Sequence, residues 1–258
     1  MVTCYDFTMA QLLNHTGIDC LLVGDSVAMT MHGFATTVSA TLTMMVLHTR
    51  AVSRGASEPC IVSDLPFLSY RKSLTQGVTA AQKLMQAGAH AIKLEGARGN
   101  LKLIAHLVES GVPVMGHLGL TPQHFHALGG YKVQCKTRQT AQQLQNDAQA
   151  LEEAGCFAVV LECIPWPLAQ TITETLKIAT IGIGAGRYTD GQVLVIQDLL
   201  GLNPNFKPKF VKHFMHGAAL IQQAIAEYRQ AIASGTFPHN EHSYSNNNVA
   251  PTTPTTTS

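Results

Sequence analysis

The amino-acid sequence predicts an α/β protein built as a (β/α)8 barrel, in which eight parallel strands close on themselves inside a ring of helices. The chain has 258 residues, a length that fits one such barrel. Short apolar runs alternate with helical stretches about eight times along it. The runs are continuously apolar, as in parallel strands that are buried on both faces. An open, doubly wound sheet is the alternative that this pattern favours less.

The expected elements follow in chain order. We expect strands at Val2–Tyr5, Ile18–Gly24, Cys60–Asp64, Ala89–Glu95, Val112–Gly116, Phe157–Glu162, Thr180–Gly184 and Val193–Ile196. Helices are expected between them, among them Thr43–Arg54, Thr75–Ala87, Leu101–Ser110 and Thr140–Ala154. Several of these end at a glycine, as in "AVSRG", "MQAGA" and "EEAGC", where glycine supplies a left-handed cap. A final helix is expected over Phe206–Ala233, with Pro204 and Pro208 at its start.

The C-terminal end differs in composition. From about His239 the chain reads "HNEHSYSNNNVAPTTPTTTS", a polar stretch rich in threonine and proline without periodicity. Such a segment buries too little apolar area to order itself, so residues 239–258 are expected to form a mostly disordered tail. Residues 1–238 are then expected to form a single barrel domain with helices at its C-terminal end.

Composition excludes several classes of function. The net charge is +1 and no basic block is present, so a nucleic-acid partner is not expected. No apolar run approaches the roughly 18 residues of a membrane span. No signal-like segment opens the sequence, and a cytoplasmic protein is expected. Charged residues make up 13% of the chain, about half of the usual ~25%. The surface is then either neutral and polar, rich in glutamine, threonine and histidine, or partly hidden in an oligomer, and we favour the oligomer.

The cysteine pattern indicates reduced thiols. None of the six cysteines forms a C-x-x-C pair, and a chain of this length with an ordinary core needs no disulfide framework. Buried, reduced thiols are expected, which suits a cytoplasmic protein. The six are Cys4, Cys20, Cys60, Cys135, Cys156 and Cys163.

Chemically active side chains gather at the predicted strand ends. The C-terminal ends of barrel strands converge on one mouth, so these groups are expected to share a pocket. Taken singly, each has a structural alternative, such as capping a helix or forming a turn. Together they are hard to explain in that way, because they follow consecutive strands: Asp25, Ser26, Asp64, Lys93, Glu95, His117 and Glu162.

Clustered carboxylates repel one another, and the usual remedies are a raised pKa or a bound cation. Oxygen ligands favour Mg²⁺. Zinc is disfavoured because His117 has no second histidine at ligand spacing and no cysteine pair accompanies it. His124 and His126 in "PQHFHALGG" are expected to face solvent. The run "IGIGAGRYTDGQ" lacks the spacing of a dinucleotide-binding fingerprint and is expected to form a tight turn.

Eight motifs in order carry a resemblance to a known family. They are "VGDSVAMT", "SDLPF", "IKLEG", "GHLGLTPQ", "GGYKVQ", "VVLECIP", "IGIGAG" with "TDGQ", and "FPHNEHSY". Together they resemble the ketopantoate hydroxymethyltransferase family over nearly the whole chain, from Thr3 to about Tyr244. One such motif would be weak, whereas eight in the same order are specific.

The resemblance implies a Mg²⁺-dependent (β/α)8 barrel of the phosphoenolpyruvate/pyruvate superfamily that assembles as a decamer. It implies a hydroxymethyltransferase that moves the one-carbon unit of 5,10-methylenetetrahydrofolate onto 3-methyl-2-oxobutanoate through a Mg²⁺-stabilised enolate. The product would be 2-dehydropantoate, in pantothenate biosynthesis. These are expectations from the family, separate from those drawn from composition or spacing.

The resemblance also assigns roles by motif. Asp25 and Asp64 match metal ligands, and Glu95 matches an acidic group of the metal shell. Glu162 matches the proton acceptor. The substrate-binding residues would be Asp25, Ser26, Lys93, His117 and Tyr5, of which Ser26 and Lys93 bind the keto acid while His117 and Tyr5 line the pocket.

The chain departs from the family at several places. Ala97 replaces a usual glycine after Glu95, Cys135 replaces the glycine of "KVQG", the threonine-rich tail is additional, and family members carry a further N-terminal segment. None of these removes a proposed catalytic group. A Mg²⁺-dependent carbon–carbon lyase of the isocitrate-lyase type is one alternative, but its cysteine motif is absent from the sequence. An inactive barrel used for assembly or binding is the other, although Asp25, Asp64 and Glu162 are all present.

Overall fold

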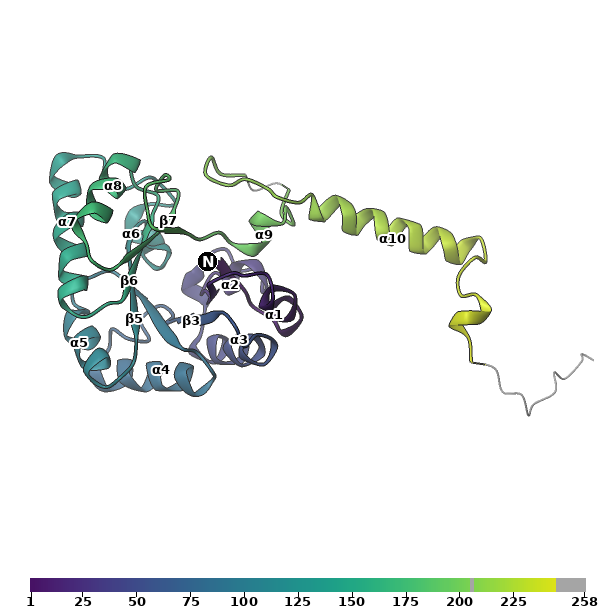
Figure 1. Cartoon of the computed structure of the whole chain (residues 1–258), viewed down its shortest axis with the longest axis horizontal. Helices are drawn as coiled ribbons and strands as arrows, with labels where there is room; N and C mark the ends of the chain where they lie inside the picture. Colours follow the sequence, from purple (N-terminus) through teal and green to yellow (C-terminus); the bar gives the residue numbers. More distant parts are fainter. Residues whose placement is uncertain (205–206, 245–258) are drawn as a thin grey trace, which may run out of the picture.

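The computed structural model describes residues 1–204 and 207–244. Its centre is one sheet of eight parallel strands in the order β1-β2-β3-β4-β5-β6-β7-β8 (Figure 1). A parallel bridge between Val2 and Leu194 brings the end of the sheet back to its start, with the Thr3 amide donating to Leu194 O at 3.1 Å. The predicted (β/α)8 barrel is confirmed. The strands are β1 Val2–Thr3, β2 Cys20–Val23, β3 Cys60–Asp64, β4 Ala91–Glu95, β5 Val114–Gly119, β6 Ala158–Glu162, β7 Ala179–Ile183 and β8 Gly191–Gln192.

Helices follow the strands and surround the sheet (Figure 1). Three of the long ones start at a hydroxyl residue whose side chain accepts a hydrogen bond from a backbone amide of the first turn: Thr41, Ser73 and Thr137. The α-helices are α1 Phe7–Asn14, α2 Val27–Thr30, α3 Leu42–Gly55, α4 Leu74–Gln86, α5 Leu101–Glu109, α6 Phe125–Leu128, α7 Arg138–Glu153, α8 Trp166–Thr175, α9 Ile196–Leu199 and α10 Gly217–Ala233. Among the described residues, no helix is long and apolar enough to cross a membrane.

The core has two parts because strand side chains alternate between two faces. One set, which includes Leu21 and Ile61, packs against the surrounding helices. The other set fills the inside of the barrel: Leu22, Val62, Ala91, Met115, Ala158, Val160 and Val193. This alternation fixes which residues further along each strand also point inward.

The eighth strand differs from the prediction. A strand was expected at Val193–Ile196, but β8 is Gly191–Gln192, followed by the single bridge at Leu194. The Ile196 amide donates to Thr3 Oγ1 at 2.9 Å, and α9 begins at that residue. The apolar run Val193–Ile196 resembles a strand in sequence, but its last residue is the first residue of the short helix α9. The tight turn expected before it is present, with φ of 64° at Gly184 and 87° at Gly186.

The last helix begins later than predicted. Helix was expected from Phe206, which lies outside the described residues, but residues 207–216 are not helical and α10 starts at Gly217. The intervening chain turns at Pro208 and brings Lys209 and Phe210 to the barrel mouth. Gly217 then packs on Leu200, where a Cβ would lie 2.6 Å from the carbonyl oxygen.

Figure 1 shows α10 running outward from the barrel. Large apolar residues on it are 49–56% exposed: Leu220, Ile221, Ile225, Tyr228 and Ile232. Beyond it, Asn240–His242 forms a short 3-10 turn within the segment that was expected to be disordered. Residues 245–258 of that expected tail lie outside the described residues.

The cysteines are all free thiols, as predicted, but they are not all buried. Cys4 and Cys156 are buried, whereas Cys60 is exposed. The expectation of burial was wrong for Cys60 because the first residue of β3 lies at the open N-terminal end of the barrel.

Candidate active site

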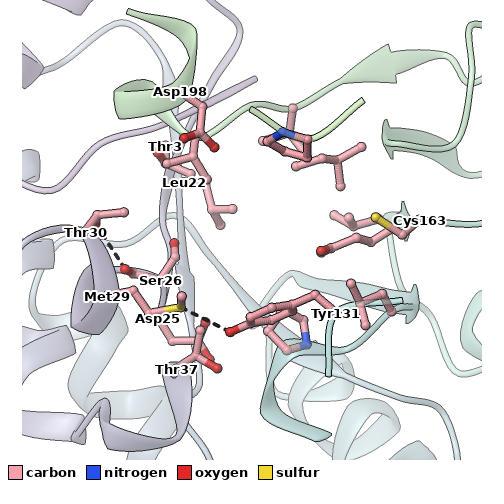
Figure 2. Close-up of a pocket in the computed structure, with 18 of the residues that line it drawn as sticks. Thr3, Leu22, Asp25, Ser26, Met29, Thr30, Thr37, Tyr131, Cys163 and Asp198 are labelled. Carbon is pink, nitrogen blue, oxygen red and sulfur yellow. Dashed lines mark hydrogen bonds between the residues drawn. The ribbon is translucent and has the colours of Figure 1, made fainter. Parts of the chain in front are cut away.

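A cavity of about 850 Å³ opens at the C-terminal ends of the strands. Figure 2 shows Asp25, Ser26 and Met29 on one wall and Tyr131 and Cys163 on the facing wall. All but one of the predicted site residues line this cavity: Asp25, Ser26, Asp64, Lys93, Glu95, His117 and Glu162. The structure therefore brings together side chains from five consecutive strand ends.

Strand alternation explains why these polar residues point inward. Five of the seven lie an even number of positions after an apolar residue of the barrel interior, and so share its face. Asp64 follows Val62, His117 follows Met115, and Glu162 follows Val160 at a spacing of two, while Lys93 and Glu95 follow Ala91. Two positions further toward the C-terminal end of these strands, the apolar interior of the barrel is thus replaced by polar residues that line the cavity.

Tyr5 is the exception. It is 1% exposed and does not line the cavity, contrary to what the family resemblance implied. Its hydroxyl lies 2.8 Å from Ser26 Oγ, so Tyr5 supports Ser26 from behind. A Cβ at Gly24 would lie 2.7 Å from Ser26 Oγ, so any side chain there would displace this hydroxyl from its contact with Tyr5.

Lys93 lies inside the acidic group. Its Nζ is 2.7 Å from Asp64 Oδ1, and both side chains are only 4% exposed. The second oxygen of Asp64 accepts a hydrogen bond from the Asp25 amide at 3.0 Å. Burial acts to lower the pKa of Lys93, but the nearby carboxylates of Asp64, Glu95 and Asp25 outweigh it and raise that pKa. Lys93 is therefore a fixed cation.

One lysine does not balance the carboxylates around it. Burial raises the pKa of Asp25 to about 7, and the charge of Asp64 adds to this effect. Burial and the Asp25 charge likewise raise the pKa of Glu95 well above its usual value. Burial is the larger cause for both groups, and three carboxylates face one lysine, so the site resists full ionisation of all three.

Glu162 occupies a less polar part of the same cavity. Its side chain is 15% exposed, and burial raises its pKa to about 8. Its Oε2 lies 3.1 Å from His117 Nε2, while His117 Nδ1 lies 3.3 Å from Lys93 Nζ. Burial, followed by the charge of Lys93, lowers the pKa of His117 well below its usual value, so the imidazole is neutral. The site thus contains a carboxylate that can exchange a proton near neutral pH.

Comparison with known proteins identifies the family. The profile of the family described as ketopantoate hydroxymethyltransferase matches residues 1–240. The chain belongs to the ketopantoate hydroxymethyltransferase family. It is 54% identical over 245 residues to the 3-methyl-2-oxobutanoate hydroxymethyltransferase of Bdellovibrio bacteriovorus, covering 95% of this chain and 93% of that protein. It is 55% identical over 246 residues to the enzyme of the same name from Coxiella burnetii, covering 95% and 92%. It is therefore an enzyme, a transferase of the hydroxymethyl type.

Solved structures show where the fold belongs. Phosphonopyruvate hydrolase in complex with oxalate and Mg²⁺ matches with a TM-score of 0.60 at 12% identity, over 93% of this chain and 87% of that one. A 2,3-dimethylmalate lyase, described as a member of the PEP mutase/isocitrate lyase superfamily, matches with a TM-score of 0.54 at 14% identity, over 90% and 80%. At these identities, the structural similarity establishes only the fold of this chain.

Gln123 is a site residue that the sequence analysis did not assign. It is 4% exposed, its side-chain amide donates to Asp25 Oδ2 at 2.8 Å, and its backbone amide donates to Glu95 Oε2 at 3.0 Å. Tyr70 donates to its carbonyl oxygen at 2.8 Å, which fixes the orientation of the amide. Its place at the end of "GHLGLTPQ" marked it as part of a motif, but no charge or strand end pointed to its role.

His124, next to it, was expected to face solvent and is only partly exposed. Its side chain is 42% exposed, and its Nδ1 lies 4.0 Å from Glu95 Oε2. Burial, with the charge of Arg71, lowers the pKa of His124. The residue lies at the edge of the acidic group and is not one of the residues that line the cavity.

The outer part of the cavity is formed by chain segments between the regular elements. Tyr131, from the loop after α6, donates a hydrogen bond to Met29 Sδ in α2 at 3.3 Å (Figure 2). Lys132, Lys209 and Phe210 also line this part. The cavity is therefore acidic at its floor and lined by aromatic and basic residues toward its opening.

The residues present fit a hard divalent cation by their donor type and charge. Asp25, Asp64 and Glu95 offer carboxylate oxygens in a buried place that carries excess negative charge. Within residues 1–204 and 207–244, no three acidic, histidine or cysteine side chains already stand in a metal-binding arrangement. The ammonium of Lys93 lies against Asp64 in this structure.

Proposed function

We propose that this chain transfers the one-carbon unit of 5,10-methylenetetrahydrofolate to C3 of 3-methyl-2-oxobutanoate, giving 2-dehydropantoate in pantothenate biosynthesis. Family membership and the names of relatives at about 55% identity support this proposal. The observation that carries it is the buried group at the barrel mouth, in which Lys93 and the carboxylates of Asp64 and Glu162 face one cavity.

Two residues would bind the keto acid. The ammonium of Lys93 complements a carboxylate or a developing oxyanion, and its burial strengthens that interaction. Ser26 would add a hydroxyl donor from the first turn after β2, held in place by Tyr5. Asp25, Asp64 and Glu95 would hold Mg²⁺. When bound, Mg²⁺ supplies a Lewis acid that stabilises negative charge developing on the keto oxygen.

Glu162 would be the general base. It would take the proton from C3 of the keto acid, and a pKa of about 8 suits a base that works near neutral pH. Neutral His117, 3.1 Å away, would orient the carboxylate without neutralising it. The C3 carbon would then form a bond to the methylene carbon of the folate as the bond from that carbon to N10 breaks. Water would replace N5 on the same carbon, releasing 2-dehydropantoate and tetrahydrofolate. The second substrate would enter through the outer part of the cavity, which Tyr131, Lys132 and Phe210 line.

The same proposal includes a homo-oligomer, a decamer by family resemblance. The low charge content of 13% and the exposed apolar side chains of α10 support association with further copies of the chain. Six free thiols are consistent with a cytoplasmic location.

The direct test is the formation of 2-dehydropantoate by the purified full chain. We expect product only when 3-methyl-2-oxobutanoate and 5,10-methylenetetrahydrofolate are both present, loss of activity with a chelator, and recovery when Mg²⁺ is returned. Cleavage of isocitrate-type substrates, with no product from the keto acid and folate, would contradict the proposal and favour a carbon–carbon lyase.

A further inference from the structure

Two cysteines meet at the opposite end of the barrel from the candidate active site. Cys20 begins β2 and Cys60 begins β3, and the two residues pair in register. Neighbouring strands lie about 4.8 Å apart. A disulfide needs a Cα separation of roughly 4.4–6.8 Å, so this pairing places the backbone of the two residues within bonding range.

The side chains of these residues share one face. Cys20 precedes Leu22 by two positions and Cys60 precedes Val62 by two, so both thiols point to the barrel interior. Cys20 is partly buried against that interior cluster, and Cys60 is exposed. The in-register pairing and the shared face bring the two thiols next to each other. The exposed Cys60 thiol thus lies beside the partly buried Cys20 thiol.

His90 completes the group. The Ile61 amide donates to its Nδ1 at 3.0 Å, so Nδ1 is the acceptor of this ring and Nε2 is its donor. Cys60 directly precedes Ile61, so the ring lies beside its thiol. The adjacent Cys20 thiol, and then the His90 ring, outweigh burial and lower the pKa of Cys60 to about 6. The same contact, with burial, raises the pKa of Cys20.

We propose that Cys20 and Cys60 form a reversible thiol–disulfide site that reacts with low-molecular-weight disulfides at the N-terminal end of the barrel. Cys60 attacks a disulfide RSSR, forming a mixed disulfide and releasing one RS⁻. Cys20 then attacks the Cys60 sulfur, which releases the second RS⁻ and forms the Cys20–Cys60 bond. Two protein thiols are oxidised, one RSSR is reduced to two RSH, and the two thiol protons go to the released thiolates. Excess thiol reverses both steps.

The remaining cysteines differ in their surroundings. Burial raises the pKa of Cys4 to about 11 and the pKa of Cys156 and Cys163 to about 12. Burial also raises the pKa of Cys135. Thiolate character and exposure decide which cysteine reacts. Cys60 is therefore the expected first site of attack.

The test uses the folded full chain treated with oxidised glutathione. We expect an intact mass lower by two hydrogen atoms and a proteolytic peptide in which Cys20 is linked to Cys60, both reversed by dithiothreitol. Cys20→Ser should stop at a glutathione adduct on Cys60, whereas Cys60→Ser should give neither the link nor an adduct on Cys20. Cys156→Ser, at a buried thiol, is the matched control and should behave as the wild type.

A stable glutathione adduct on wild-type Cys60 with Cys20 still free would overturn the proposal, as would an unreacted Cys60. His90 is tested by the pH profile of Cys60 alkylation. His90→Asn keeps an acceptor for the Ile61 amide but removes the imidazole, and should move the midpoint upward by roughly one pH unit. An unchanged midpoint would contradict the role of His90. Circular dichroism matching the wild type establishes that each variant is folded.

Discussion

At the scale of single residues, the candidate site depends on how a buried acidic group is kept in place. Lys93 supplies one cation, and Gln123 supplies two hydrogen bonds that hold Asp25 and Glu95 apart at fixed positions. When a buried acceptor loses its donor, no hydrogen bond offsets the free-energy cost of removing that acceptor from water. Residues that donate to the carboxylates therefore matter almost as much as the carboxylates themselves.

Gln123→Leu should weaken both the site and the fold. The substitution leaves Asp25 Oδ2 and the Tyr70 hydroxyl without their partner, so we expect unfolding to become easier by about 1–3 kcal/mol. Activity should fall at least about tenfold because the carboxylates lose their orientation. Denaturant unfolding and the product assay check this. Gln142→Leu, on the exposed face of α7, is the control, and equal behaviour of the two variants would contradict the role of Gln123.

Asp25→Ala and Asp64→Ala should reduce Mg²⁺ binding and activity together. Each removes an anionic oxygen that the cation needs, and Asp64→Ala also removes the partner of Lys93. Calorimetric titration should show weaker Mg²⁺ binding in both variants. The product assay should show a loss of at least about 100-fold in activity. Asp19→Ala, at an exposed aspartate, should change neither. Full activity at unchanged Mg²⁺ dependence in both site variants would remove these residues from the metal site.

The pH dependence follows from Glu162. Burial raises the pKa of this carboxyl to about 8, so it is protonated below that pH and cannot accept a proton. Removal of the C3 proton should therefore speed up as the pH rises from 6 and level off above about 8. The rate of hydrogen exchange at C3, measured across this range, checks the direction. A rate that falls as the pH rises would mean that a group acts there in its protonated form.

At the scale of elements, the sequence predicted the features that depend on strand periodicity, namely the strands and the residues that point into the barrel. Seven strands and the inward-facing residues Asp64, Lys93, Glu95 and Glu162 were found because a parallel strand buried on both faces leaves a continuous apolar run that ends at the mouth. Gln123 was not assigned, because its role depends on contacts with distant strands and not on a local pattern. β8 was misplaced because the apolar run predicted as a strand leads into α9, whose first amide donates to Thr3. The start of α10 was misplaced because residues 207–216 are not helical and the helix begins at Gly217, against Leu200.

At the scale of the whole molecule, α10 is the element whose side chains remain most exposed. Ile221, Ile225, Tyr228 and Ile232 follow one another at three or four positions, as on one face of a helix, and the helix extends from the barrel (Figure 1). A stripe of this kind in an isolated chain favours association. We therefore expect the exposed apolar face of α10 to be buried only in an oligomer.

Ile225→Glu should reduce the size of the oligomer. The substitution places a charge in the middle of the exposed apolar stripe, where association would bury it without a partner. Light scattering at micromolar concentration should report a large assembly for the wild type and smaller species for Ile225→Glu. Gln223→Glu, which adds the same charge on the opposite side of α10, should leave the assembly intact. A wild type that is a stable monomer would contradict the proposed oligomer.

The most direct measurement of the central claim is the exchange of the C3 hydrogen of 3-methyl-2-oxobutanoate with deuterated water, in the presence of Mg²⁺ and without folate. It isolates proton removal from the transfer step. Wild type should exchange, and Glu162→Gln should be slower by about 10²–10⁴, because the amide keeps the shape but cannot accept the proton. Binding of the keto acid and of Mg²⁺ to Glu162→Gln should stay nearly unchanged. Undiminished exchange in Glu162→Gln would show that another group is the base and would contradict the account of this site.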